Sequence, residues 1–255
     1  MTAGLWAMGG IAVLFLVLPP AVMFFLKAHG GRWLDFFTGA GIFFLFAMVL
    51  ESILHNVVLL ATPLGAVLQS NIWLYGLYGG LAAGIFEETG RLVAFRFLLK
   101  SHRSRITALG YGIGHGGCEA ILLLSVTYLS NIALMAAARS GEALPQEAQA
   151  VAAQLAALPA ATFLWAGLER VSAIALHIAL SVLVFTAVTR PGRRGLFFAA
   201  VALHAAMDFI AVVCNAYFPL VATELLVAVF AALTVWLAVR IYQKLPEHAE
   251  GEAAA

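Results

Sequence analysis

The chain has 255 residues, of which 63% are hydrophobic and only 11% are charged, and its formal net charge is +1. Soluble globular domains carry about 25% charged residues, so this composition excludes a soluble domain of this size. The small net charge also excludes a strongly basic nucleic-acid-binding protein. Cys118 and Cys214 both lie in apolar runs, so no disulfide framework or CxxC site is expected. The sequence therefore predicts an all-α polytopic membrane protein.

About seven transmembrane helices are expected, because a spanning helix needs roughly 20 mostly apolar residues. The segments that qualify lie at about 4–26, 36–61, 71–99, 106–137, 161–189, 195–216 and 220–243. Residues 145–159 have apolar side chains at helical spacing between two prolines, which predicts a short interfacial helix on the outer face. We expect residues 1–245 to form one transmembrane domain and residues 246–255 to form a disordered cytoplasmic tail.

The basic residues indicate the orientation of these spans. Eleven Lys and Arg residues follow the first, third, fifth and seventh spans, whereas Arg139 is the one basic residue in the other connections. The positive-inside rule then places the N-terminus outside and the C-terminus in the cytoplasm. We expect a multi-pass protein of the plasma membrane, such as the inner membrane of a bacterium, with the lipid bilayer as its surroundings and no nucleic acid as a partner.

Ionisable residues inside the spans point to a functional site. A charged side chain at the centre of the bilayer costs about 2.5–3.5 kcal/mol even on the more lenient insertion scale. Such residues must therefore face one another or a water-filled cavity. Those expected inside the spans are Glu51, Glu87, Glu88, Glu119, Glu169, Asp208, Arg91, Arg170, His55, His115, His177 and His204.

Four of these side chains are predicted to lie at one depth, and they come from four different helices. At 1.5 Å per residue they lie roughly 14–20 Å from the cytoplasmic ends of their helices. These residues are Glu87, His115, His177 and His204. Glu51 and His55 lie further toward the outer side, so we expect them, with Glu169, to serve packing or an access path. A layer of one carboxylate and three imidazoles favours a working site over isolated structural hydrogen bonds.

Helical spacing predicts partners for the layer at about 100° per residue. Arg91 projects between Glu87 and Glu88, and we interpret Glu88–Arg91 as a structural ion pair. On the fifth span, Arg170 and His177 share one stripe.

Two further pairs lie one helical turn apart, namely His115 with Glu119 and His204 with Asp208. A carboxylate one turn from a histidine can fix the orientation and tautomer of its ring. Five glycines surround His115 on the fourth span, which indicates either close helix packing or an irregular stretch where a substrate backbone approaches.

This layer has the parts needed to activate water. A glutamate accepts the proton, a histidine positions the water or shuttles the proton, and a second donor stabilises the oxyanion formed at an amide carbonyl. Ser181 is the one serine near the layer, so no Ser/His/Asp nucleophile stands out, and no HExxH motif occurs. No resident cofactor is predicted, yet His115, His177, His204 and Glu87 could hold zinc, since three histidines with an open position form a catalytic geometry.

Four motifs follow one another between about residues 71 and 210: Glu87-Glu88-Thr-Gly-Arg91, Tyr111-Gly-Ile-Gly-His115, Glu169-Arg170-(six residues)-His177 and His204-Ala-Ala-Met-Asp208. This ordered set resembles the YhfC-type intramembrane proteases, which belong with the CAAX-type prenyl proteases, the bacteriocin-processing proteins and the PrsW-like proteases. The resemblance implies an all-helical glutamic-type intramembrane endopeptidase that hydrolyses a peptide bond of a membrane-embedded or lipidated substrate.

The resemblance also implies roles for single residues. Glu87 and His115 would activate the water, His177 would line the site, and His204 with its i+4 partner would stabilise the oxyanion. The supporting residues would be Glu88, Arg91, Glu119, Arg170 and Asp208.

The sequence departs from the CAAX-type pattern in three places. Two residues rather than three separate the glutamate pair from Arg91, Tyr111 replaces phenylalanine, and Asp208 replaces asparagine. An ionised aspartate would repel an oxyanion, so we expect Asp208 to orient His204, to be protonated, or to share a proton with Glu87.

Two other functions remain open at this point. Buried Glu and His residues also mark proton- or ion-coupled transporters, although no inverted repeat of the transporter kind is seen. A non-catalytic, peptide-binding scaffold of the same fold is the third reading.

Overall fold

The computed structural model describes residues 3–141 and 143–247, and the regular structure within these ranges is helical throughout. The first half contains α1 (Ala3–Ala28), α2 (Trp33–Phe43), the π-helical stretch η1 (Phe44–Glu51), α3 (Ser52–His55), η2 (Asn56–Leu60), α4 (Pro63–Ser70), α5 (Ile72–Val93) and η3 (Ala94–Leu98). The second half contains α6 (Arg105–Ala120), η4 (Ile121–Ser125), α7 (Val126–Ser140), α8 (Gln146–Ala157), α9 (Ala160–Thr189), α10 (Gly195–Tyr217) and α11 (Leu220–Tyr242). The predicted all-α fold is confirmed.

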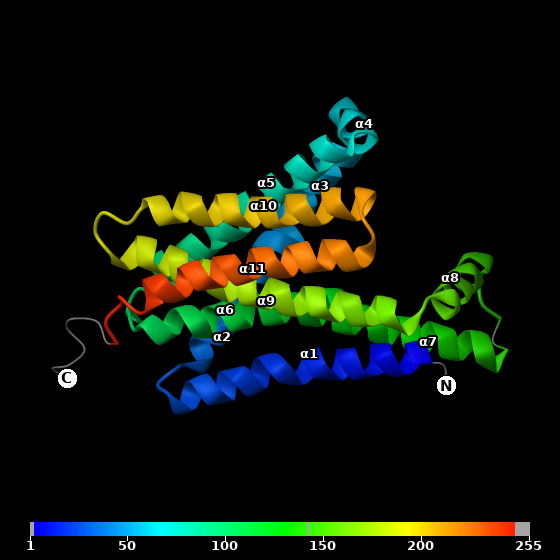
Figure 1. The fold of residues 1–255 in the computed structure, drawn as a ribbon, viewed down its shortest axis with the longest axis horizontal. Coiled ribbons are helices and arrows are strands. Elements are labelled where there is room, and N and C mark those ends of the chain that lie inside the picture. Colours follow the sequence, from blue (N-terminus) through cyan, green and yellow to red (C-terminus); the bar gives the residue numbers. More distant parts are fainter. Residues whose placement is uncertain (1–2, 142, 248–255) are drawn as a thin grey trace.

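The long helices lie alongside one another in a bundle, and the beginning of α1 and the end of α11 lie at opposite ends of it (Figure 1). Within the described residues, six helices are long and apolar enough to cross a membrane, which confirms a polytopic membrane protein. They are Ala3–Ala28, Trp33–Leu60, Arg105–Ser140, Ala160–Thr189, Gly195–Tyr217 and Leu220–Tyr242. The predicted span 71–99 is also helical over residues 72–98, but this segment, which carries Glu87, Glu88 and Arg91, is not among the six. The count of seven spans and their orientation stay predictions.

The smaller predicted features fall at proline boundaries. Helix α8 begins directly after Pro145 and ends before Pro159. It therefore lies within the segment 145–159 that is predicted to be helical. Its place at the membrane surface stays a prediction. Of the predicted tail 246–255, Pro246 and Glu247 lie within the described residues, and the remainder lies outside them.

Helix α9 forms the centre of the bundle. It packs against α1, α5, α6, α10 and α11, and 78% of its most apolar stretch is buried inside the protein. Two apolar cores meet along it, one including Leu180 and Leu183 and the other including Phe163 and Ile174. Most of the apolar surface of α9 is therefore covered by protein, while Leu164, Leu168 and Val171 near its beginning stay exposed.

The glycines of α6 bring neighbouring backbones into close contact. A Cβ atom added at Gly114 would overlap the carbonyl of Phe36 on α2, and one added at Gly39 on α2 would overlap the carbonyl of Tyr111 on α6. On the opposite face of α6, a Cβ at Gly112 would lie 2.6 Å from the Cα of Ile178 on α9. Because α6 is a regular helix from Arg105 to Ala120, close packing and not an irregular stretch explains these glycines.

The α2–α6 crossing supplies a stability test. We expect Gly114→Ala and Gly39→Ala each to lower the free energy of unfolding by about 1–3 kcal/mol, because the added methyl groups meet backbone atoms that cannot rotate away. Gly41→Ala is the matched control on α2, since its Cβ would meet no atom within 4 Å. Denaturant titration of the purified protein in detergent measures all three variants. Equal stability of Gly39→Ala and Gly41→Ala would contradict this crossing.

Candidate active site

The four side chains predicted to share a layer lie together in the bundle interior. Glu87 comes from α5, His115 from α6, His177 from α9 and His204 from α10, and each is no more than 7% exposed. The ring centroids of His115 and His177 lie 4.7 Å apart, and those of His177 and His204 lie 5.2 Å apart. Four helices thus contribute to one compact polar centre within an apolar bundle.

Glu87 and His115 form the most direct pair of this centre. Oε2 of Glu87 lies 2.7 Å from Nε2 of His115, within hydrogen-bond distance. Nδ1 of His115 is buried and has no hydrogen-bond partner among the described residues. The ring of His115 also packs edge-on against Phe43, with centroids 5.2 Å apart. One nitrogen therefore holds the carboxylate, and the other is left for a proton or a ligand.

The tautomer of His177 follows from its two neighbours. A guanidinium nitrogen of Arg91 lies 3.1 Å from Nδ1, and because guanidinium groups only donate, Nδ1 must accept. Nε2 therefore carries the proton, and it lies 2.5 Å from Oε2 of Glu119. Both nitrogens of His177 are engaged by the protein.

Glu119 continues this network away from the centre. It pairs with Arg170, which also pairs with Glu169. The side-chain exposure rises along the series, from 4% at His177 to 25% at Glu169. The predicted shared stripe of Arg170 and His177 on α9 thus corresponds to two side chains joined through a carboxylate of α6.

His204 is held by a carboxylate from another helix. Oε1 of Glu88 lies 2.8 Å from Nδ1 of His204, and Glu88 also forms the predicted ion pair with Arg91. An ion-paired carboxylate accepts hydrogen bonds, so Nδ1 of His204 donates to it. Nε2 of His204 lies 4.0 Å from Glu87 and 3.7 Å from Asp208. This nitrogen is the one that faces Glu87.

The partners predicted from single helical turns are corrected by these contacts. The prediction that Glu119 fixes His115 is wrong, because Glu87 binds His115 and Glu119 binds His177. Glu88 rather than Asp208 holds the ring of His204, since Asp208 lies beyond hydrogen-bond distance and its side chain is 38% exposed. For His115 and His204, a neighbouring helix therefore offers a nearer partner than the next turn of the same helix does.

Ser181 and the pair Glu51–His55 form no hydrogen bond with the side chains of the centre among the described residues. The hydroxyl of Ser181 donates to the carbonyl of His177 at 2.7 Å, so its own helix occupies it. Nε2 of His55 lies 3.1 Å from Glu51, and Nδ1 lies 2.9 Å from the hydroxyl of Tyr78. Tyr78 escaped the sequence analysis because a tyrosine in an apolar run carries no charge signal.

Two further buried acids are not among the six expected inside the spans. Asp35 is fully buried, and Glu224 is 7% exposed in the first turns of α11. Glu224 lies within the predicted span 220–243, so its position in the sequence could have identified it. Asp35 lies just before the predicted span 36–61, where the sequence gives no sign that the side chain is covered.

Glu87, His177 and His204 also form a group that can hold a metal ion. Their ligand atoms lie within 4.8 Å of one another, and all three side chains are buried. One carboxylate and two imidazoles with an open fourth position are a known catalytic zinc set, so the donors fit the ion in kind and spacing. Glu88 also supplies the hydrogen bond that a ligating His204 needs at its other nitrogen. His177 fits less well, because each of its nitrogens already has a partner.

The fold and this centre define a class: a polytopic membrane protein with a buried Glu/His centre suited to hydrolysis. Residues 12–231 match the family model described as YhfC intramembrane metalloprotease. The chain is also 37% identical over 247 residues to the "Uncharacterized membrane protein YhfC" of Bacillus subtilis (strain 168), covering 91% of this chain and 95% of that protein. The chain belongs to the YhfC intramembrane metalloprotease family. No solved structure matches it significantly.

The buried ion pair supplies a second stability test. We expect Glu88→Gln to lower the free energy of unfolding by about 3–5 kcal/mol, because it leaves the fully buried guanidinium of Arg91 without its counter-charge. Glu224→Gln is the control, since Oε2 of this buried acid has no hydrogen-bond partner among the described residues. Denaturant titration in detergent compares them. The assignment fails if Glu88→Gln unfolds at the same denaturant concentration as Glu224→Gln.

Proposed function

We propose that the protein hydrolyses a peptide bond of a membrane-embedded or lipidated substrate, with water activated by Glu87. The observation that carries this proposal is the 2.7 Å contact between Glu87 and His115 in a centre that also holds His177 and His204. Membership of an intramembrane protease family supports peptide hydrolysis over the transporter and the non-catalytic scaffold.

Glu87 is the group that takes the proton from water. Its Oε2 is held by His115, while Oε1 faces His204 at 4.0 Å. A carboxylate positioned within hydrogen-bond reach of water can act as a general base. The carboxylic acid formed in this way can then give the same proton to the leaving amine.

His204 is the group that stabilises the oxyanion. Two atoms 4.0 Å apart can both contact one small group at hydrogen-bond distance, so Nε2 of His204 and Oε1 of Glu87 can face the same reacting carbon from different sides. Because Nδ1–H already donates to Glu88, this role requires His204 in its imidazolium form, whose second proton lies on Nε2. Nε2–H then donates to the carbonyl oxygen as that oxygen becomes negative. Glu88 holds Nδ1, which keeps the ring in this orientation.

His177 is a positioning residue in this mechanism. Its Nδ1 accepts from Arg91, and its Nε2 lies 2.5 Å from Oε2 of Glu119, so both nitrogens face side chains of the protein. It fixes Arg91 against Glu88, and Glu88 in turn fixes His204.

A metal-dependent reaction is the second candidate, and the family description favours it. Glu87, His177 and His204 would hold the ion. When bound, zinc supplies a Lewis acid that polarises a carbonyl and lowers the pKa of water. Holding it would require His177 to give up its contact with Arg91 or with Glu119, and this need supports the glutamate mechanism.

The first functional test removes the proposed base. We expect Glu87→Gln to reduce cleavage roughly 10²–10⁴-fold, because an amide cannot take the proton from water. Purified protein in proteoliposomes is given a library of transmembrane peptides, and mass spectrometry detects the new peptide ends. Glu224→Gln should cleave at the wild-type rate. Wild-type cleavage by a folded Glu87→Gln variant would refute the role of Glu87.

The second test separates the two mechanisms. We expect purified protein to contain far less than one zinc per chain and to keep its cleavage rate in the presence of a chelator. Elemental mass spectrometry of wild type, His204→Ala and Asp208→Asn measures the zinc content. One zinc per chain that is lost in His204→Ala and retained in Asp208→Asn would establish the metal-dependent reaction instead.

A further inference from the structure

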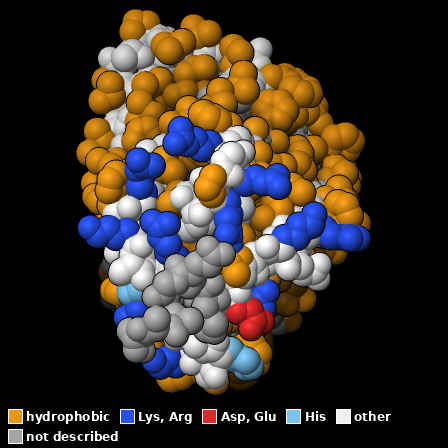
Figure 2. Space-filling model, turned by 90° about the vertical axis from the view of Figure 1, so that its left-hand side faces the viewer, with side chains coloured by type: hydrophobic (Ala, Val, Ile, Leu, Met, Phe, Trp, Pro, Cys, Tyr) orange, Lys and Arg blue, Asp and Glu red, His pale blue; other side chains and the backbone are white. Residues whose placement is uncertain are grey.

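A cationic cavity lies at the end of the bundle where α11 ends. It has a volume of about 830 Å³, and it is lined by the connection between α9 and α10 and by the last turns of α11. Figure 2 shows this end of the molecule, with Lys and Arg side chains gathered across it and apolar side chains around them. This volume is within the range of ligand-binding cavities, about 300–1,000 Å³.

Four positive charges surround the cavity: Arg190, Arg193, Arg240 and Lys244. Among the described residues none of the four takes part in a salt bridge, and no Asp or Glu lines the cavity. Like charges repel one another, so bringing them together around one hollow is unfavourable without an anion between them. The cavity therefore fits an anionic ligand.

The walls of the cavity are apolar. Leu196, Leu237 and Ile241 line it between the charged groups. Leu237 is 37% exposed, and it continues into the exposed side chains of Leu233 and Trp236 on α11. A ligand that fills both parts carries a negative headgroup and an apolar chain that follows α11.

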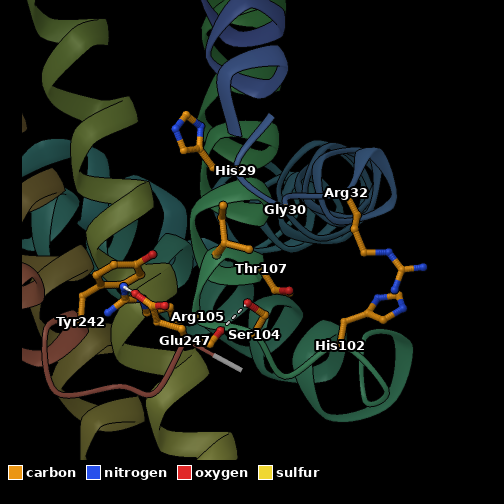
Figure 3. A pocket seen from close by; sticks show the side chains of 10 residues that line it. His29, Gly30, Arg32, His102, Ser104, Arg105, Thr107, Tyr242 and Glu247 are labelled. Atoms are coloured by element: carbon orange, nitrogen blue, oxygen red, sulfur yellow. Dashed lines mark hydrogen bonds and ion pairs between the residues drawn. The ribbon is translucent and has the colours of Figure 1, made fainter. Parts of the chain in front are cut away.

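A neighbouring cavity of about 390 Å³ lacks this combination (Figure 3). There Arg105 forms a salt bridge with Glu247 at 2.6 Å and lies 5.0 Å from the ring centroid of Tyr242. His102 and Arg32 lie beside each other on the far side of Thr107 (Figure 3). Glu247 thus already neutralises Arg105 in this smaller cavity. The larger cavity is therefore the better site for an anion.

We propose that this cavity binds the headgroup of an anionic phospholipid from the leaflet at the basic end of the protein. The phosphate lies among Arg190, Arg193, Arg240 and Lys244, and the acyl chains lie along the exposed face of α11. Basic hollows between transmembrane helices on the cytoplasmic side are suited to such headgroups. The site lies outside the Glu/His centre, so it does not depend on the proposed reaction.

The test counts lipids bound to the intact chain. Native mass spectrometry of the detergent-purified protein is run with phosphatidylglycerol, with phosphatidylcholine of the same acyl chains, and with inorganic phosphate. The cavity variant changes the four lining cations to Gln. The control variant changes Lys27, Arg96, Lys100 and Arg103 to Gln, which removes the same charge on the same predicted side but outside the cavity.

We expect wild type to retain phosphatidylglycerol at least tenfold more tightly than phosphatidylcholine. The cavity variant should lose at least tenfold of this affinity, while the control variant stays within about threefold of wild type. A third variant with Arg→Lys at 190, 193 and 240 keeps the charges, and it should bind like wild type, which separates loss of charge from loss of fold.

Three results would overturn the proposal. Equal losses in the cavity and control variants would mean that the lipid responds only to diffuse surface charge. Displacement of phosphatidylglycerol by an equal concentration of inorganic phosphate would mean a site for free phosphate. A gain of tenfold or more in lipid binding on changing Glu250 and Glu252 to Gln would mean that the acidic tail of the chain is the occupant.

Discussion

The polar centre depends on one buried cation. The guanidinium of Arg91 is fully buried and contacts both Glu88 and His177. Glu88 in turn accepts a hydrogen bond from His204 and so orients its ring. A charge removed from water in this way is tolerated only with a counter-charge and further hydrogen bonds. Arg91 therefore fixes α5, α9 and α10 relative to one another before any substrate arrives. This rigidity benefits hydrolysis, because groups held in place at the start need no reorganisation as charge develops.

The same contacts distinguish the residues that face a substrate from those that face the protein. His177 gives both nitrogens to Arg91 and Glu119, whereas His115 and His204 each keep one nitrogen that the described side chains do not hold within hydrogen-bond distance. The three histidines thus look alike in the sequence motifs, although His177 contacts the protein and the other two each have a nitrogen available to a substrate. The name of the family points to a metal, whereas the contacts of His177 with Arg91 and Glu119 support our proposal that Glu87 acts on water.

The sequence correctly predicted that Glu87, His115, His177 and His204 meet, because the rise per residue and the basic residues at the helix ends are both readable from the chain. It predicted the neighbours poorly. Glu119 was expected beside His115 and is found at His177, since which carboxylate meets which imidazole depends on how helices rotate about their axes. Tyr78 and Asp35 were missed for a related reason: one carries no charge, and the other lies at a span boundary whose covering comes from distant segments.

The backbone contacts of α6 have a consequence for motion. At Gly114 the backbone of this helix packs directly against α2, and at Gly112 it packs directly against α9 on the opposite face. Sliding or rotating α6 would bring its backbone into collision with the backbones of α2 and α9. The position of His115 on α6 is therefore fixed. Any gate that admits a peptide must therefore open by displacing other helices.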